Sequence, residues 1–258
     1  MRVHRVENPP TDPIVFVSIN RFERKKDIGL AVRALAQLHA KLPHARPALL
    51  LAGGWDPRVQ ENVEHYNELH ALCMVRTWSL GTPAYLPPPP SHLTLSPPAQ
   101  ELGLRALPPR AGDSMAASDV IQGVAKQGLA DVGFVRSFSD GDKNELLQLA
   151  SAVLYTPQRE HFGIVPIEAM AAHRPVIACA SGGPLESIRD GKTGFLQAPE
   201  PAAFADAMFR VASQPGRAVA MGAAGRSRAV DTFSRAAFGK RLSDMCKHLV
   251  QHGSLQGL

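Results

Sequence analysis

The sequence predicts an α/β protein in which a parallel sheet is covered by helices on both faces. Two observations lead to this fold class. Short, unbroken apolar segments, typical of strands buried on both faces, recur along the chain, and segments with apolar residues at helical spacing separate them. Strands and helices that alternate in this way form parallel β-α-β units, so the expected architecture is a doubly wound sheet.

The predicted elements alternate from residue 14 onward. The first strand, residues 14–19 (IVFVSI), is bounded by Pro13 and Asn20, and Asp27 is expected to cap the helix that follows it. Further strands are predicted at 47–52, 132–135, 152–155 and 175–179, with one more short strand after the turn at 190–194. Further helices are predicted at 59–72, at 142–150, from near Pro166, and from 201 onward with a break at 215–216.

The segment 74–122 departs from this alternation. Nine of the 22 prolines lie between Pro83 and Pro109, including the run at 87–90. Proline lacks a backbone donor and stops helices, so we expect a disordered or polyproline-like insert. An insert without a function of its own is preferred here to a proline-rich recognition site. The predicted organisation is a polar N-terminal segment (1–13), one domain formed by 14–73 and 123–250, this insert, and a tail (251–258).

Composition narrows the classes of function. A chain of 258 residues with a formal charge of +5 and a pI near 9.3 fits anionic small ligands, nucleic acid or an anionic membrane, and does not choose among them. Its basic residues are not interleaved with aromatic residues, which make up 6% of the chain, so no nucleic-acid partner is expected. The sequence has neither an apolar signal segment nor a run of about 18 apolar residues.

Cysteine and glycine motifs exclude several kinds of chemistry. Cys73, Cys179 and Cys246 have no C-x-x-C spacing and no neighbouring histidine cluster, which indicates free thiols in a reducing compartment and no structural zinc. Neither G-x-x-x-x-G-K-[ST] nor G-x-G-x-x-G occurs, so a P-loop and dinucleotide redox chemistry are not predicted. We expect no metal and no cofactor.

Basic residues follow the first predicted strand, and ligands of parallel sheets bind at the carboxyl ends of the strands. Arg21 and Lys26 are five residues apart in this loop. Arginine presents a planar fork to phosphate oxygens and lysine a mobile point charge, so together they would neutralise a diphosphate. A solvated basic turn explains the same spacing, and the spacing alone leaves the two interpretations equal.

Two glutamates lie seven residues apart beyond the strand 152–155. Glu160 is predicted in the loop, Gly163 lets backbone approach a ligand, and Pro166 suits a first helical turn, which places Glu168 early in that helix. Free N–H groups at the helix start attract phosphate, and the carboxylates would accept hydrogen bonds from vicinal hydroxyls of a sugar or ribose. Alternatively, Glu168 compensates the helix dipole and Glu160 is a solvated loop residue.

A second glycine loop, residues 181–186 (SGGPLE), opens another predicted helix and includes Gly182 and Gly183. By itself it is weak support for a site. Together with Arg21, Lys26 and the segment EHFGIVPIEA at 160–169, it resembles the donor-binding half of family 4 retaining glycosyltransferases. The resemblance covers roughly residues 12–73 and 124–250. Longer strings, SINRFERKKDIGLAVRAL and LYTPQREHFGIVPIEAMAAHRPVIACASGGPLESI, resemble the mannosyltransferases of that family that extend lipid-linked oligosaccharides.

The resemblance implies a Rossmann-like domain, the C-terminal half of a GT-B fold, and a role for each site residue. Arg21 and Lys26 would hold the diphosphate of the donor, and Glu168 would bind its ribose hydroxyls. Glu160 would be the catalytic residue that contacts mannose. The backbone N–H groups near Phe162 and Gly163, and the loop of Gly182 and Gly183, would complete the substrate site. Members of this family are retaining and need no metal.

The implied reaction transfers mannose from GDP-mannose to Man-GlcNAc2-diphosphodolichol, first in α-1,3 and then in α-1,6 linkage. It implies a place on the cytosolic face of the endoplasmic reticulum membrane. Peripheral membrane association is expected through the N-terminal acceptor-binding half, which this chain lacks. Two alternatives stay open: a transferase that uses another nucleotide sugar, such as a UDP-sugar, and a truncated isoform that binds nucleotide sugar or a partner without turnover.

Overall fold

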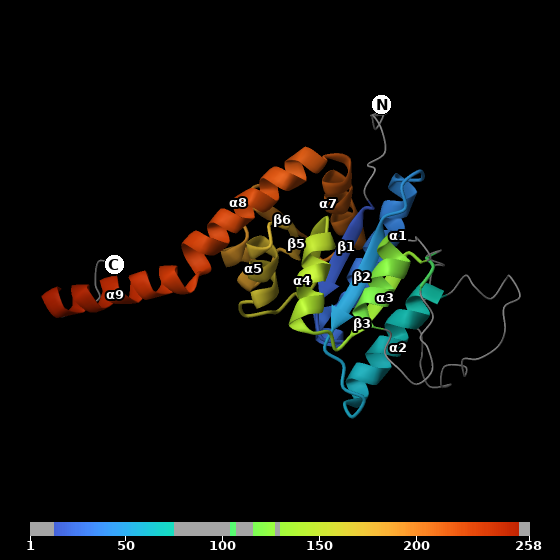
Figure 1. The fold of residues 1–258 in the computed structure, drawn as a ribbon, viewed down its shortest axis with the longest axis horizontal. Helices are drawn as coiled ribbons and strands as arrows, with labels where there is room; N and C mark the ends of the chain where they lie inside the picture. Colours follow the sequence, from blue (N-terminus) through green and yellow to red (C-terminus); the bar gives the residue numbers. More distant parts are fainter. Residues whose placement is uncertain (1–12, 75–103, 107–115, 127–129, 253–258) are drawn as a thin grey trace, which may run out of the picture.

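A single parallel sheet forms the centre of the molecule (Figure 1). The computed structural model describes residues 13–74, 104–106, 116–126 and 130–252. The sheet has six strands in the order β3-β2-β1-β4-β5-β6, and every neighbouring pair is parallel. The strands are β1 Val15–Ile19, β2 Ala48–Gly53, β3 Val132–Arg136, β4 Ala152–Tyr155, β5 Val176–Cys179 and β6 Gly194–Gln197. The predicted fold class is confirmed, and the predicted strand bounds hold to within one residue.

Helices cover both faces of the sheet, as predicted. They are α1 Ile28–Lys41, α2 Gln60–Met74, α3 Ala117–Ile121, α4 Asp140–Leu149, α5 Ile164–Ala171, α6 Gly183–Ser187, α7 Pro201–Ser213, α8 Pro215–Phe233 and α9 Arg235–His252. A 3₁₀ turn, Arg24–Lys26, precedes α1, and a π-helical turn, Gln122–Lys126, follows α3. The predicted break near 215–216 is confirmed, whereas a second break between α8 and α9 was not predicted.

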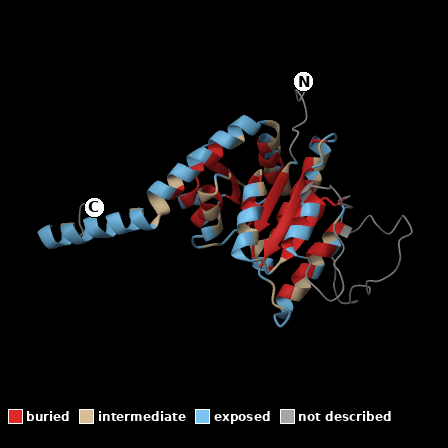
Figure 2. Cartoon of the chain, viewed as in Figure 1, coloured by how far each residue is buried: buried red, intermediate tan, exposed pale blue. Residues whose placement is uncertain are grey.

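Alternate residues of the central strands enter two separate apolar cores. Phe16 packs with α1, α2 and α7 on one face, while Val15 and Val17 pack with α3, α4 and α5 on the other. The strands are therefore buried on both faces, as Figure 2 shows. Burial on both faces explains why these strands have unbroken apolar sequences rather than alternating ones.

The strand order contains one topological switch. From β1 the chain proceeds outward to β2 and β3, then returns to the other side of β1 and proceeds outward again through β4, β5 and β6. The loops that leave β1 and β4 at their carboxyl ends consequently diverge to opposite faces. Open α/β sheets bind their ligands at the carboxyl ends of the strands beside such a switch point.

The predicted insert at 74–122 needs correction at two places. Ala106 forms a parallel bridge with Val132 beside β3, and Leu104 is buried in the core. Ala117, Val120 and Ile121 of α3 are buried against the opposite face. These residues follow the apolar pattern of the domain despite the neighbouring prolines, so for them the prediction of disorder is wrong. The proline run at 87–90 lies outside the described residues.

The predicted cap of α1 is also corrected. Asp27 occupies the N-cap position, but its backbone is left-handed, with φ 47°, and its side chain makes no capping hydrogen bond. The carboxylate instead accepts a hydrogen bond from Gln158 Nε2 at 3.0 Å. Asp27 thus ties the loop after β1 to the loop after β4.

The last helix extends away from the sheet (Figure 1). Along α9 the apolar side chains of Phe238, Leu242 and Met245 are exposed, and Figure 2 shows the helix pale blue over most of its length. Within the described ranges, no helix is both long and apolar enough to cross a bilayer.

Candidate functional site

The loops after β1 and β4 meet at the carboxyl edge of the sheet, at the topological switch. Thr156 Oγ1, just beyond β4, donates a 2.6 Å hydrogen bond to the carbonyl oxygen of Lys26. With the bond from Gln158 to Asp27, this fixes the end of the 3₁₀ turn over the end of β4. The two loops therefore form one rigid rim, although 130 residues separate Lys26 from Thr156 in the sequence.

At this rim Lys26 and Glu160 form an ion pair between Nζ and Oε2. Only 13% of the Lys26 side chain and 29% of the Glu160 side chain are exposed. Lys26 lowers the pKa of the Glu160 carboxyl, because its ammonium group hydrogen-bonds the charged form. Two of the predicted site residues are thus brought together, as a cation from the loop after β1 and an anion from the loop after β4.

Tyr155 and Gly163 shape the floor beneath Glu160. Burial, together with the Glu160 carboxylate, raises the pKa of the Tyr155 phenol well above its usual range. Gly163 has φ 76°, and a Cβ at this position would lie 2.4 Å from Tyr155 Oη. Gly163 is therefore required by its own backbone conformation and by the close approach of the phenol.

Arg21 occupies a different part of the same edge. Its exposed side chain pairs with Glu23 at 3.2 Å, and Glu23 also pairs with Lys25 at 3.0 Å. The Arg21 side chain lies beside Gly54, which follows β2. The structure thus places Arg21 between the ends of β1 and β2, while Lys26 contacts Glu160 at the end of β4.

Glu168 lies two residues further along its helix than the sequence interpretation assumed, because α5 begins at Ile164. It is the fifth residue of α5, whose first turn contains no acidic residue, so the alternative that Glu168 compensates the helix start is wrong. Its Oε1 lies 2.9 Å from Nζ of Lys143, in α4. Lys143 was not predicted as a site residue. The available signal was a lysine near the start of a helix that directly follows a strand.

The glycine loop before α6 packs on the backbone of the Glu160 loop. The N–H of Gly183 donates to the carbonyl of Glu160 at 3.0 Å, and a Cβ on Gly183 would lie 2.0 Å from the carbonyl oxygen of Phe162. Gly182 has φ 57°, and a Cβ there would lie 2.2 Å from the same Glu160 carbonyl. Both glycines are thus necessary for the position of Glu160. Ser181 Oγ is buried beside them without a hydrogen-bond partner.

The side chain and the backbone of Phe162 have different roles. Its ring packs edge to face against Phe233 of α8, with centroids 5.9 Å apart. The side chain is nevertheless 41% exposed. The ring therefore anchors the loop, while the backbone from Phe162 to Gly163 lies at the start of α5, where helix N–H groups are available to an anion.

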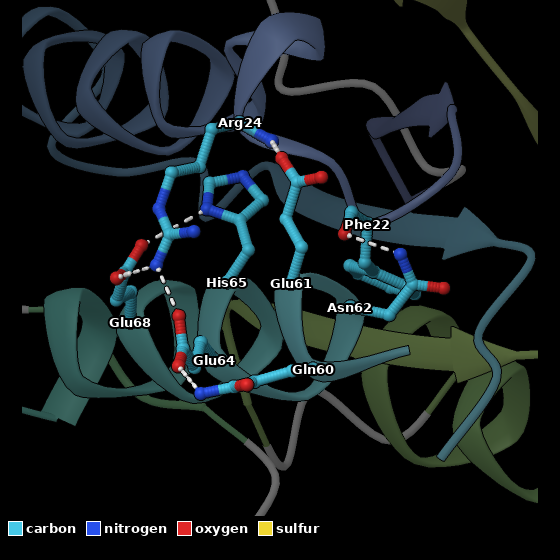
Figure 3. A network of polar contacts seen from close by, with 8 residues as sticks. All are labelled: Phe22, Arg24, Gln60, Glu61, Asn62, Glu64, His65 and Glu68. Carbon is cyan, nitrogen blue, oxygen red and sulfur yellow. Dashed lines mark hydrogen bonds and ion pairs between the residues drawn. The ribbon is translucent and has the colours of Figure 1, made fainter. Parts of the chain in front are cut away.

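A polar network attaches the basic loop after β1 to α2 (Figure 3). Arg24 Nη2 lies 2.9 Å from Glu64 Oε2 and 2.6 Å from Glu68 Oε1, while the Arg24 backbone N–H donates to Glu61. Asn62 Nδ2 donates to the carbonyl of Phe22 at 3.2 Å. Arg24 is therefore held against α2, whereas Lys26 contacts Glu160.

The electrostatic character of the site follows from these contacts. Cations (Arg21, Lys26 and Lys143) and carboxylates (Glu160 and Glu168) share the carboxyl edge, each with a partner of opposite charge. Among the described residues, no group of three or more His, Cys, Asp or Glu side chains could hold a metal ion. Cys73, Cys179 and Cys246 are free thiols. The arrangement suits an anionic ligand that also carries hydroxyl groups.

Comparison with known proteins is consistent with this geometry. Residues 112–228, which contain both glutamates and both glycines, match the family described as glycosyl transferases group 1. The chain is 38% identical over 245 residues to the alpha-1,3/1,6-mannosyltransferase ALG2 of Mus musculus, a match that covers 94% of this chain. Over residues 112–228 the chain is similar to the group 1 glycosyltransferases. A human relative of the same name is 39% identical over 237 residues.

The chain spans about half the length of the curated relatives it matches, 47% of the mouse protein and 45% of the human one. Solved structures agree on the fold. Sucrose-phosphate synthase from Thermosynechococcus elongatus superposes with a TM-score of 0.61 at 24% identity, over 94% of this chain and 47% of that one. The C-terminal domain of a glycosyl transferase group 1 protein from Francisella tularensis, with a TM-score of 0.55 at 17% identity, is covered over 89% of its length. The chain thus has the fold of one half of a GT-B glycosyltransferase.

Proposed function

We propose that this chain is the donor-binding half of a retaining mannosyltransferase that uses GDP-mannose and a dolichol-linked oligosaccharide acceptor. One observation carries the proposal: over 90% of the chain aligns with mannosyltransferases at 38–39% identity. In support of it, Lys26 and Glu160 meet at the switch point of the sheet. The switch point is where a doubly wound sheet binds its ligand.

In the proposed complex, the donor replaces existing ion pairs. The diphosphate takes Lys26 from Glu160, and Arg21, whose side chain is exposed, leaves Glu23 to reach the same phosphates. The N–H groups at the start of α5, near Phe162 and Gly163, bind a phosphate oxygen. Glu160, once released from Lys26, accepts hydrogen bonds from the mannose hydroxyls.

The proposed reaction replaces one C–O bond with another. The bond between the anomeric carbon and the diphosphate breaks while the acceptor oxygen bonds to that carbon on the same face. The departing diphosphate takes the acceptor's proton, so no nucleophile of the protein is required. Lys26 and Arg21 stabilise the charge that develops on the diphosphate, and loss of one preorganised contact of this kind typically costs about 3–4 kcal/mol in the transition state.

Acceptor binding is assigned to a part of the relatives that this chain does not span. The relatives are about twice its length, and the acceptor-binding domain and any peripheral contact with the endoplasmic reticulum membrane, on its cytosolic face, would belong to that other half. Residues 13–252 supply the donor side of the cleft. The order of the two linkages, α-1,3 and then α-1,6, is part of the same proposal.

Two alternatives remain distinguishable. A structure of HepE from Anabaena in complex with UDP-glucose superposes with a TM-score of 0.60, so the same fold accommodates another nucleotide sugar in that protein. Competition between GDP-mannose and UDP-glucose, followed by the melting temperature of the purified chain, separates the donors. We expect GDP-mannose to act at the lower concentration, and a stronger effect of UDP-glucose would refute the proposed donor.

Turnover is tested with the purified chain, GDP-mannose and a synthetic dolichol-linked acceptor. Product that forms with the wild-type chain and disappears with Glu160→Gln supports the transferase. Donor binding without any product is expected both of a donor-binding half that lacks its acceptor domain and of a non-catalytic isoform, whereas product formation excludes the isoform. If neither GDP-mannose nor UDP-glucose binds, the proposed site is wrong.

A further inference from the structure

Lys143 lies at the end of the first turn of α4, where the helix dipole gives a lysine no benefit. It is the fourth residue of α4, and the N-terminal end of a helix repels cations because the helix dipole is positive there. The start of α4 is already satisfied by a complete capping box. Ser139 Oγ accepts from the backbone of Asp142, and Asp142 accepts from the backbone of Ser139. Lys143 is not needed to form this helix, so its presence requires another explanation.

The contacts of Lys143 point away from its own helix. Its Nζ lies 2.9 Å from Oε1 of Glu168 and 3.6 Å from Oδ1 of Asp140. Asp140 is 98% exposed and contributes little because water screens such pairs. Glu168 is 30% exposed and Lys143 24% exposed, so this pair is partly shielded. The hydrogen bond to Glu168 raises the pKa of Lys143.

The buried neighbours of Glu168 hold its backbone in place, whereas its side chain is oriented by a contact from another helix. The neighbouring residues of α5 (Pro166, Ile167, Ala169 and Met170) are buried and hold the helix on the sheet. Glu168 is the single charged residue in α5, and in the described part of the chain Lys143 is its recorded partner. The ammonium group of Lys143 binds Oε1 of Glu168, and this bond also fixes the direction of Oε2.

We propose that Lys143 is a positioning residue for donor binding. It holds the Glu168 carboxylate in the rotamer that accepts hydrogen bonds from the vicinal hydroxyls of the donor ribose. This inference rests on the proposed function, because it takes Glu168 as the ribose ligand. Lys143 itself is not assigned a contact with the donor.

The test compares GDP with 2′,3′-dideoxy-GDP, which lacks both ribose hydroxyls. Titration calorimetry gives the affinity ratio of the two nucleotides for the wild-type chain, Glu168→Gln, Lys143→Met and Lys143→Arg. The wild-type chain should prefer GDP by at least about tenfold, because hydrogen bonds to a charged carboxylate are stronger than neutral ones. Lys143→Met should reduce this preference to the level of Glu168→Gln, and Lys143→Arg should restore most of it.

If Lys143 has a merely structural role, its substitution should weaken the binding of both nucleotides equally and leave the ratio of their affinities unchanged. Asn144→Met, at the next and exposed position of α4, is the matched control and should keep the wild-type ratio. The double variant of Lys143→Met with Glu168→Gln should show the ratio of Glu168→Gln alone, because both substitutions remove one unit.

The outcomes separate the two proposals. If Glu168→Gln removes the preference for GDP while Lys143→Met retains it, Lys143 does not position Glu168, and the donor site stands. If Glu168→Gln retains the wild-type preference, Glu168 is not the ribose ligand and the proposed site itself is wrong. An equal loss in Lys143→Met and Asn144→Met would also overturn the role of Lys143.

Discussion

Glu160 is paired with Lys26, the cation that the proposed donor needs. Replacing Glu160 should therefore tighten the binding of a nucleotide diphosphate. In the free domain Lys26 is neutralised by Glu160. A diphosphate must displace this carboxylate before it can reach the ammonium group. The substitution Glu160→Gln removes the competing charge and leaves a side chain of nearly the same size. We expect a higher affinity for GDP.

The magnitude follows from the burial of the pair. Two unit charges about 4 Å apart interact by about 4 kcal/mol at an effective dielectric constant near 20, whereas fully exposed pairs contribute only about 0.2–1 kcal/mol. Lys26 and Glu160 are 13% and 29% exposed, which places them between these limits after solvent screening. We take about 1–2 kcal/mol, which corresponds to roughly a 5- to 30-fold gain in GDP affinity.

Calorimetric titration of GDP and of GDP-mannose measures this gain. GDP should gain the full factor and GDP-mannose less, because Glu160 also serves as the proposed ligand of mannose. Glu145→Gln, an exposed glutamate of α4, changes the net charge equally and should leave both affinities unchanged. An unchanged or weaker GDP affinity in Glu160→Gln would refute the competition between carboxylate and diphosphate.

Three further predictions test the framework of the site. Gly183→Ala should displace the Glu160 loop, since the new Cβ would lie 2.0 Å from the Phe162 carbonyl oxygen. We expect a loss of stability of about 1–3 kcal/mol in urea unfolding and weaker GDP binding. Wild-type values for both would contradict the contact. Asp131→Asn should lower the free energy of unfolding by about 1–3 kcal/mol, because this buried carboxylate accepts the Arg105 N–H at 2.8 Å. A loss of stability no greater than that of the exposed Asp140→Asn would contradict this contribution. Lys26 lowers the pKa of Glu160 below its ordinary 4.5, so the pair stabilises the fold above that value and the contribution disappears as pH falls through the lowered pKa. Urea unfolding between about pH 6 and pH 3 should thus show a steeper loss for the wild type than for Glu160→Gln, and parallel curves would exclude the linkage.

The sheet could be predicted from the sequence because its strands are buried on both faces. Segments such as 14–19 and 47–52 are apolar along nearly their whole length, as strands buried on both faces require, so their sequences locate them. Strand order is different, since it depends on contacts between distant segments. The sequence pattern does not state that β1 lies between β2 and β4, yet this neighbourhood brings Lys26 to Glu160.

The sequence predictions were wrong or incomplete where tertiary contacts, rather than local residue types, decide the structure. Proline content marked 74–122 as an insert, but Leu104 is buried in the core, and helix α3 is buried because its apolar residues find the face of β3. Asp27 has the residue type of an N-cap, but its left-handed backbone turns the carboxylate toward Gln158. Lys143 escaped notice because its partner Glu168 is 25 residues away.

The most direct test of the account is whether GDP stabilises this chain through Lys26 and Arg21. At about ten times its Kd, GDP should stabilise the chain by about 1.4 kcal/mol and raise Tm by roughly 3–6 °C. The double variant of Arg21→Ala with Lys26→Ala should lose this shift, while Lys192→Ala with Lys240→Ala, which removes the same charge from exposed positions elsewhere, should retain it. A full shift in the Arg21 and Lys26 double variant would contradict a diphosphate site at the switch point of the sheet.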